Sequence, residues 1–175
     1  MTNERRTLMD MVTGAQVAVA LTVPIPRERM WDLVTAVDRI GEWSPEATGG
    51  SWCDGTQAPA PGARFIGRNR FPSGFESKVT CVVIEAERPG VFAWSVLDDA
   101  DLVGSTWRYE LREGGEPGST LVHHSFTHGP GASGARADAE ADPRMLDSRL
   151  VTLCRNMTTT ISAMAAADST MGAVR

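Results

Sequence analysis

The sequence predicts an α+β fold in which a curved antiparallel sheet of seven strands wraps around one long C-terminal helix. Short segments of alternating apolar and polar residues recur between residues 17 and 128, separated by turn residues, and are typical of hairpin-linked strands. Two short helical segments follow the first strand, and one long helical segment ends the pattern. Because one helix cannot fill the concave side of a strongly curved sheet, we expect a ligand cavity between helix and sheet.

The first strand and the two short helices are defined by periodicity and by proline. Strict alternation predicts a half-buried strand over residues 17–23, which Pro24 ends. Apolar residues at helical spacing then predict an amphipathic helix over residues 26–37, with a proline at its first position, where the missing N–H costs nothing. We expect a second short helix over residues 38–43, stopped by Pro45.

The remaining strands follow one another through turn-forming segments. Residues 75–87 are rich in Val, Ile, Thr and Cys, which favours a strand. Segments such as 54–62, 72–74 and 114–119 carry the Gly, Pro, Asp and Ser of turns. The predicted strands are 47–53, 64–71, 75–87, 91–97, 105–112 and 120–128.

A long helix is predicted from Asp142 onward. Asp142 is a suitable N-cap and Pro143 a suitable first residue. Apolar side chains then recur every three or four residues and form a single stripe. The stripe consists of Leu146, Leu150, Leu153, Met157, Ile161 and Met164.

These elements define one domain over residues 15–167. Residues 1–14 lack a clear period and are expected to form a flexible arm, and residues 168–175 a flexible tail. The glycine-rich run 129–134 is expected to be a flexible connection, because it does not link a strand to a helix at the spacing of a nucleotide-binding loop. We therefore expect no nucleotide cofactor.

Composition excludes several functional classes. The 175 residues carry a net charge of −5 without a basic run, which argues against nucleic-acid binding and against electrostatic docking on anionic membranes. No stretch approaches the roughly 18 apolar residues of a membrane-spanning helix, so we expect no stable membrane insertion. Cys53, Cys81 and Cys154 are widely spread, as expected of buried thiols in a reducing compartment. Together with the lack of a signal-peptide pattern at the N-terminus, this predicts a cytoplasmic protein.

Five segments of the chain are similar to the SRPBCC superfamily, also called START-like, which includes lipid-transfer domains and bacterial polyketide cyclases. The segments are VPIPRERMWDLVTAVDRIGEWSPEATGG (Val23 to Gly50), PGARFIGRNR (Pro61 to Arg70), VIEAERPGVFAWSV (Val83 to Val96), STWRYEL (Ser105 to Leu111) and HGPGASG (His128 to Gly134). The resemblance covers about residues 15–166 and implies a helix-grip fold. It also implies a hydrophobic pocket for a small molecule, sometimes used for polyketide cyclisation or dehydration, but it assigns no catalytic residue.

Alternation within the predicted strands places six side chains on one face, where they would converge on the expected cavity. Aromatic rings can stack on planar ligands, an inward amide can orient a ligand carbonyl, and an imidazole titrates near neutrality. The alternatives are ordinary core packing for the rings and a hydrogen bond to a neighbouring loop for the amide. The candidate ligand-binding residues are Phe65, Asn69, Trp94, Trp107, Tyr109 and His124.

His124 and Tyr109 are also the candidate catalytic residues. His124 can act as a general acid or base if it faces the pocket, and Tyr109 can donate a proton. The alternative for His124 is a capped histidine at a sheet edge, and a slip of one residue would turn His123 inward instead. Adjacent histidines on a strand diverge and no cysteine or carboxylate stands at a ligand spacing, so we expect no metal.

The other charged residues carry no chemistry that the sequence can define. Alternation turns Arg64, Arg68, Arg70 and Arg108 outward, as a solvated face. The carboxylate groups around Glu42 and Glu46, and over residues 98–101, lack the separation of a hydrolase pair.

Two functions of the pocket stay open, beside a third hypothesis in which the helix-grip fold serves as an interaction surface for a chaperone partner. The first is a small-molecule or lipid binding protein without a cofactor. The alternative is a polyketide cyclase or dehydratase acting on a poly-β-ketone or aromatic substrate in the same pocket. The partner in both is a hydrophobic or aromatic small molecule, and the sequence leaves the oligomeric state open.

Overall fold

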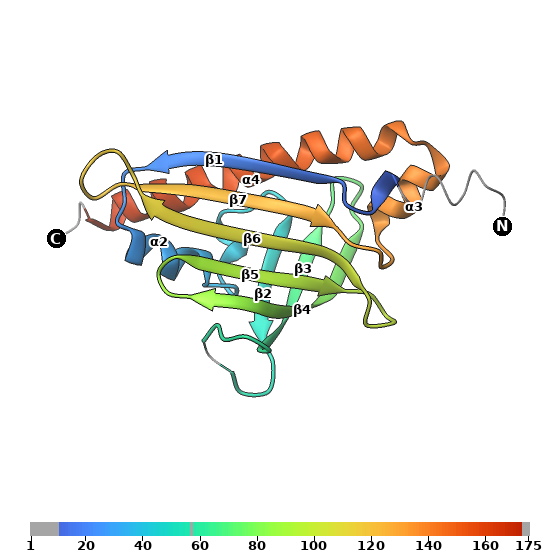
Figure 1. Ribbon diagram of the computed structural model, residues 1–175, viewed down its shortest axis with the longest axis horizontal. Helices are drawn as coiled ribbons and strands as arrows, with labels where there is room; N and C mark the ends of the chain where they lie inside the picture. Colours follow the sequence, from blue (N-terminus) through green and yellow to red (C-terminus); the bar gives the residue numbers. More distant parts are fainter. Residues whose placement is uncertain (1–10, 57, 173–175) are drawn as a thin grey trace.

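The computed structural model describes residues 11–56 and 58–172, with side chains described as far as Asp168. It confirms the predicted sheet wrapped around a long C-terminal helix (Figure 1). The strands are β1 (Gln16–Val23), β2 (Ala47–Trp52), β3 (Arg64–Arg70), β4 (Glu76–Glu87), β5 (Val91–Leu97), β6 (Val103–Glu113) and β7 (Thr120–His128). The helices are α2 (Arg27–Val34), the 3₁₀ helix η1 (Ile40–Glu42), α3 (Gly134–Ala141) and α4 (Arg144–Gly172).

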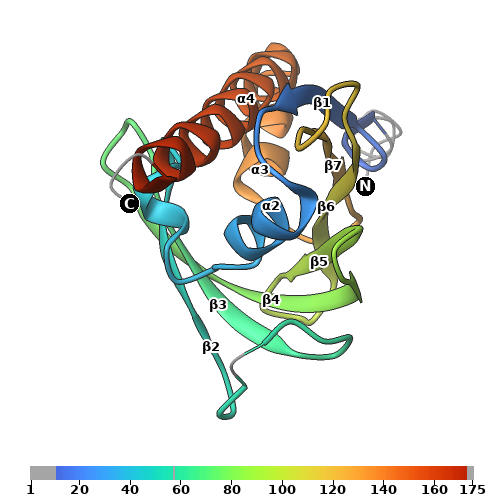
Figure 2. The same ribbon diagram turned by 90° about the vertical axis from the view of Figure 1, so that its left-hand side faces the viewer.

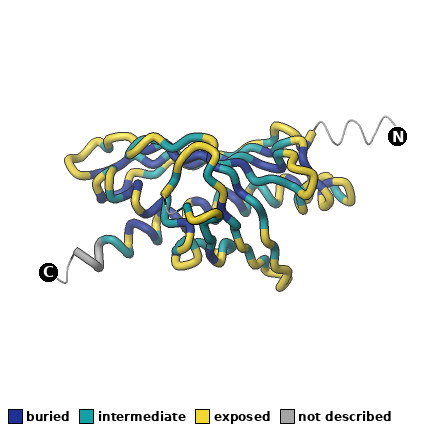
Figure 3. The backbone as a smooth tube through the Cα atoms, turned by 90° about the horizontal axis from the view of Figure 1, so that it is seen from below, coloured by how far each residue is buried: buried dark blue, intermediate teal, exposed yellow. Residues whose placement is uncertain are grey.

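The strands form one sheet in the order β1-β7-β6-β5-β4-β3-β2, and all neighbours are antiparallel. Consecutive strands from β2 to β7 therefore lie side by side, as hairpin connections require, whereas β1 pairs with β7. The sheet curls so that α2 and α4 lie on its concave side (Figure 2). Buried positions gather along the strands, and exposed positions gather at the loops (Figure 3).

Helix α4 buries the apolar stripe that its spacing predicts. Leu146, Leu153, Met157, Ile161 and Met164 are all buried, and Leu150 is half-buried. Asp142 caps this helix as predicted, because its carboxylate accepts a hydrogen bond from the backbone N–H of Arg144 at 3.0 Å. The helix lies along β1, which it contacts more extensively than any other strand.

Two predictions about the helices are corrected. The second short helix expected over residues 38–43 is only the 3₁₀ turn η1, because the chain there lies directly on β2. A Cβ added to Gly41 would come within 2.4 Å of the carbonyl oxygen of Thr48, so only glycine fits this approach. Helix α3 follows the glycine-rich run and has no counterpart in the prediction. Ser133 caps it by accepting a hydrogen bond from the N–H of Arg136 at 3.1 Å.

The two ends of the chain differ from a purely flexible arm and tail. Residues 1–10 and 173–175 lie outside the described residues. Val12 is buried and packs with Ala139 and Leu146, so the end of the predicted arm contacts α3 and α4. Helix α4 continues to Gly172, beyond the predicted end of the domain. Within the described residues, no helix combines the length and the apolar character that crossing a bilayer requires.

The core lies between the concave face of the sheet and the helices. Its largest cluster joins α2, the inner face of the sheet and the C-terminal half of α4, where Met30, Ile161 and Met164 are fully buried. A smaller cluster packs Phe126 of β7 against Leu153 and Met157 in the N-terminal half of α4. The two halves of α4 therefore meet different parts of the sheet.

Candidate functional site

All six predicted site residues lie on the concave face. In the sheet, Tyr109 stands opposite His124, Trp94 opposite Trp107, and Phe65 opposite Cys81. Directly opposite residues share a face, and this face includes Phe126, which packs against α4. The register therefore turns His124 inward and His123 outward, as alternation predicts.

Four of the six side chains form a continuous aromatic surface across β5, β6 and β7. The rings of Tyr109 and His124 stack with centroids 3.7 Å apart and planes 15° apart. Trp94 and Trp107 are nearly parallel, at 5° and 6.2 Å, and Trp107 lies 5.7 Å from His124. Phe65 of β3 extends this surface, with its ring 6.2 Å from Trp94.

The members of this aromatic surface differ in exposure. Phe65, Tyr109 and His124 are buried, with exposed fractions of 6%, 2% and 4%. Trp94 and Trp107 are only half-buried, although they lie on the inner face of interior strands. Solvent therefore reaches the two tryptophans on the concave face, while the neighbouring rings of Tyr109 and His124 are covered.

Asn69 lies apart from this aromatic surface. It is four residues from Phe65 along β3, a separation of about 13 Å in a strand. Its side-chain amide donates a hydrogen bond to Ser77 on β4 at 3.2 Å. Asn69 thus shares the concave face with the aromatic residues but lies at the end of the sheet where β3 leads into β4.

His124 is a neutral histidine with unpartnered ring nitrogens. Neither Nδ1 nor Nε2 has a hydrogen-bond partner among the described residues, and both are shielded from solvent. Burial, and secondarily the charge of His123, lowers the pKa of His124 from 6.5 to about 3. Burial also raises the pKa of Tyr109. At neutral pH the pair therefore offers a neutral imidazole and a neutral phenol, which can donate and accept hydrogen bonds.

Two further polar features of the concave side lie outside the six predicted site residues. His128 is buried, and its pKa is lowered by burial and by the positive charges of Arg136 and Arg149. Arg149 of α4 forms an ion pair with Glu46, which precedes β2. Arg149 lies three residues after Leu146, beside the apolar stripe, and this position indicates that its side chain is near the sheet. No sequence pattern, however, identifies Glu46 as its partner.

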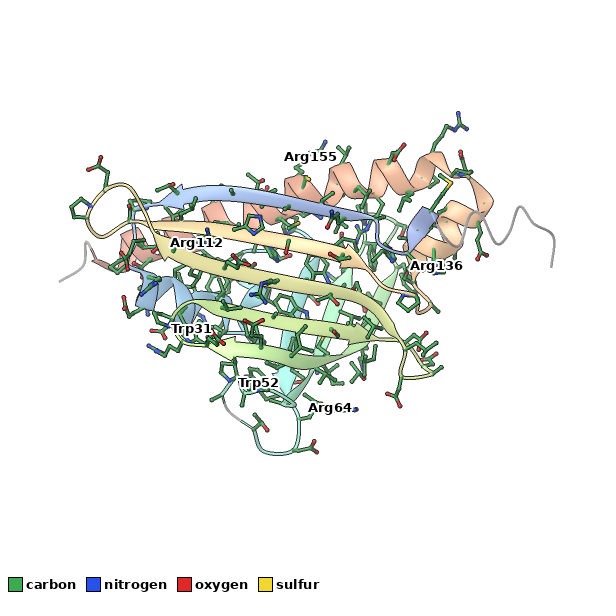
Figure 4. All side chains as sticks on the ribbon, viewed as in Figure 1. Trp31, Trp52, Arg64, Arg112, Arg136 and Arg155 are labelled. Carbon is green, nitrogen blue, oxygen red and sulfur yellow. The ribbon has the colours of Figure 1, made fainter. Side chains whose placement is uncertain are left out.

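The outer face holds a hollow of about 260 Å³, whose lining includes Glu110, Arg112 and His123. Figure 4 labels Arg112 on β6 and Arg64 on this face. Arg64, Arg68 and Arg70 are exposed there, as predicted. Arg108 corrects the prediction of a merely solvated side chain, because it forms ion pairs with Glu85 and Glu110 and is only 33% exposed. It reaches Glu85 across Ala93, which has no exposed surface.

Across residues 11–56 and 58–172, no three histidine, cysteine or carboxylate side chains come together as a metal site would need. The expectation that the protein binds no metal stays a prediction, and elemental analysis of the purified protein tests it. About one zinc or iron per chain, lost on replacing His124 and His128, would contradict it.

Comparisons with known proteins support the fold and a family. Residues 14–161 match the family model described as polyketide cyclase / dehydrase and lipid transport. No curated protein matches the sequence. Protein NE0264 from Nitrosomonas europaea is similar in structure, with a TM-score of 0.62 and 15% identity over 90% of this chain and 96% of that one.

Two further solved structures share the fold. The Polyketide_cyc-like protein Cgl2372 from Corynebacterium glutamicum has a TM-score of 0.60 and 23% identity, over 91% of this chain and 95% of its own. Protein Ms6760 from Mycobacterium smegmatis has a TM-score of 0.60 and 20% identity, over 93% of this chain and 94% of its own. At these identities the likeness concerns the fold.

Proposed function

Because the chain belongs to the polyketide cyclase / dehydrase and lipid transport family of the SRPBCC superfamily, we propose that its concave face binds a hydrophobic or aromatic small molecule. The ligand would lie between the sheet and α4, against the half-buried faces of Trp94 and Trp107. The proposal extends to a cytoplasmic protein that works without nucleic acid, in line with its acidic composition.

The partial exposure of Trp94 and Trp107 carries this proposal. Interior strands of a sheet covered by a helix normally bury large aromatic side chains on the covered face. Here the two tryptophans keep exposed surface on that face and stand nearly parallel. A flat or elongated apolar molecule would cover this surface and gain the stacking energy that aromatic rings provide.

His124 supplies the polar anchor of the proposed site. A buried donor or acceptor without a partner costs about 1–3 kcal/mol, so both ring nitrogens of His124 favour any ligand that supplies a hydroxyl or carbonyl group. The nitrogens are shielded by neighbouring side chains. A ligand would therefore reach them by displacing a neighbour, and Trp107, which is half-buried and 5.7 Å away, is placed to move.

The alternative is a cyclase or dehydratase that uses His124 and Tyr109 for proton transfer. Their stacking brings two polar groups together, which favours this alternative. Efficient acid–base catalysis, however, needs a pKa near the working pH. Burial lowers the pKa of His124 to about 3 and raises that of Tyr109, so binding is the function that the site supports better.

Titration with the hydrophobic fluorescent probe 1-anilinonaphthalene-8-sulfonate tests the proposal. We expect saturable binding at one site with quenching of tryptophan fluorescence. Trp107→Ala should weaken binding by roughly tenfold, because it removes the stacking surface. Ile84→Ala is the matched control, since Ile84 is 50% exposed and separate from the inner-face aromatic residues, and it should leave the affinity unchanged.

Replacement of His124 separates the two functions. If His124 is an anchor, His124→Ala should weaken binding of a hydroxyl-bearing aromatic probe such as 4-hydroxystilbene. Unchanged affinity, together with loss of a turnover that wild type shows, would support the enzyme instead. If the probe-binding curve of Trp107→Ala is the same as that of the wild-type protein, binding at the concave face is refuted.

A further inference from the structure

We propose that the Glu46–Arg149 ion pair is a latch that controls how fast a ligand enters and leaves the concave face. The proposal rests on the proposed function, because it concerns access to the same site. It assigns a role to three residues, Glu46, Arg149 and Asn156, that lie outside the aromatic surface.

The latch joins two segments that are distant in the sequence. The two terminal nitrogens of Arg149 donate to the carboxylate of Glu46 at 2.7 and 2.5 Å, and the side-chain amide of Asn156 donates to it at 3.2 Å. Arg149 and Asn156 belong to α4, whereas Glu46 directly precedes β2, the strand at the opposite edge of the sheet from β1. Since α4 lies along β1, this ion pair ties α4 to the other edge and so spans the concave face.

The latch also holds the end of β3. The guanidinium of Arg149 lies over the ring of Phe71 at 5.5 Å, and Phe71 stacks on Phe75 at 5.8 Å, in the hairpin between β3 and β4. The backbone N–H of Arg70 donates to the carbonyl oxygen of Glu46 at 2.9 Å. Release of Arg149 would therefore free the start of β2 and this hairpin from α4 together.

The opposite end of the concave side is closed in a different way. There α2 and the C-terminal half of α4 enclose a packed apolar cluster in which Met30, Trp31, Ile161 and Met164 are at most 3% exposed. Opening that end would expose apolar surface to water. Opening the latch instead exposes the charges of Glu46 and Arg149 to water. Their side chains are already 14% and 27% exposed, and hydration of the separated charges offsets part of the attraction that is lost. The latch end is therefore the less costly route to the site.

A route of this kind is needed because the site is largely covered. The ring nitrogens of His124 are shielded, and Trp94 and Trp107 beside it are only half-buried. Asn69, Ser77 and the latch residues lie at the same end of the sheet, since Ala47, which follows Glu46, stands opposite Asn69. A ligand that enters at the latch would pass these polar groups before it reaches the aromatic surface.

Stopped-flow mixing with 1-anilinonaphthalene-8-sulfonate tests the latch. Glu46→Gln and Arg149→Gln should each raise the association and dissociation rates by about tenfold, the factor expected when a partly buried ion pair is removed from the closed state. The equilibrium affinity should change little, because these residues do not form the aromatic surface. In wild type, added salt should accelerate both rates, since it weakens the ion pair.

Asp168→Asn is the matched control. It removes the charge from the ion pair between Arg29 of α2 and Asp168, which also ties α4 to the body of the protein. Asp168 lies 19 residues from Arg149, about 28 Å along the helix. Exchange rates in Asp168→Asn should match those of wild type. The charge-swapped variant Glu46→Arg/Arg149→Glu should restore slow exchange if the single variants act through the lost pair.

The outcomes separate the latch from the proposed function. Saturable binding with rates that neither the single variants nor salt alter would overturn the latch and leave the binding function intact. Failure of wild type to bind the probe would overturn both. If the single variants do not fold, the latch is tested by the charge-swapped variant and by the salt dependence of the wild-type rates. Wild-type rates that do not change with salt would overturn the latch.

Discussion

Replacing Leu153 with Ala is expected to lower the free energy of unfolding by about 2–5 kcal/mol, the usual cost of such a truncation in a packed core. Leu153 is 3% exposed and packs with Phe126 and Met157, where the N-terminal half of α4 meets β7. The truncation would leave a cavity at that contact. Urea unfolding followed by circular dichroism measures the loss.

Val151→Ala is the matched control for this prediction. Val151 lies on the same helix two residues away and is 60% exposed, so the same type of truncation should change stability by less than about 0.5 kcal/mol. A loss for Leu153→Ala as small as that of the control would contradict the packing of α4 on the sheet.

Acidification from pH 6.5 to 5 is expected to cost about 2 kcal/mol of stability through His124 alone. The pKa of His124 is about 3 in the folded protein, against about 6.5 in an unfolded chain. The unfolded state therefore binds the proton more readily. The stability that comes from the neutral imidazole is complete above pH 6.5 and is lost as the pH falls toward 3.

His124→Phe tests this prediction, because phenylalanine keeps the stacking on Tyr109 and removes the titrating group. The variant should lose this part of the pH dependence. It should also be about 1–2 kcal/mol more stable at pH 7, since two unpartnered buried nitrogens disappear. The lowered pKa of His128 adds a dependence of the same sign, which would remain.

His123→Phe is the control. It removes an imidazole from the outer face of the same strand, so the steep loss of stability below pH 6.5 should persist. Equilibrium unfolding at pH 7, 6 and 5 compares the three proteins. A His124→Phe variant that is less stable than wild type at pH 7, with the same pH dependence, would mean that His124 has a structural hydrogen bond.

The sequence predicts most of this fold because its signals are local. Alternation in β1, β5, β6 and β7 defines which side chains face inward, and the sheet confirms the register at Tyr109 and His124. The stripe from Leu146 to Met164 likewise needs only the period of a helix. Such patterns are sufficient because a side chain on the wrong face would cost its whole burial energy.

The missed features depend on contacts between distant segments. Helix α3 has no apolar stripe and follows a glycine-rich run, so its stability comes from packing, as in the contact of Ala139 with Val12. The pairing of Glu46 with Arg149 joins positions 103 residues apart. Likewise, alternation turns Trp107 and His124 inward but gives no measure of their exposure, which depends on how far α4 stands from the sheet.

Ligand binding on the concave face at Trp94 and Trp107 can be observed by NMR of the tryptophan indole N–H signals. The chain has five tryptophans, each with one such signal, and single Trp→Phe variants assign them. On titration with 1-anilinonaphthalene-8-sulfonate, the signals of Trp94 and Trp107 should shift and saturate at one probe per chain. Those of Trp31 and Trp43, which are buried in the core cluster with α2, should stay in place. Unshifted Trp94 and Trp107 signals, with backbone amide shifts at the outer hollow around Glu110 and His123, would contradict binding on the concave face.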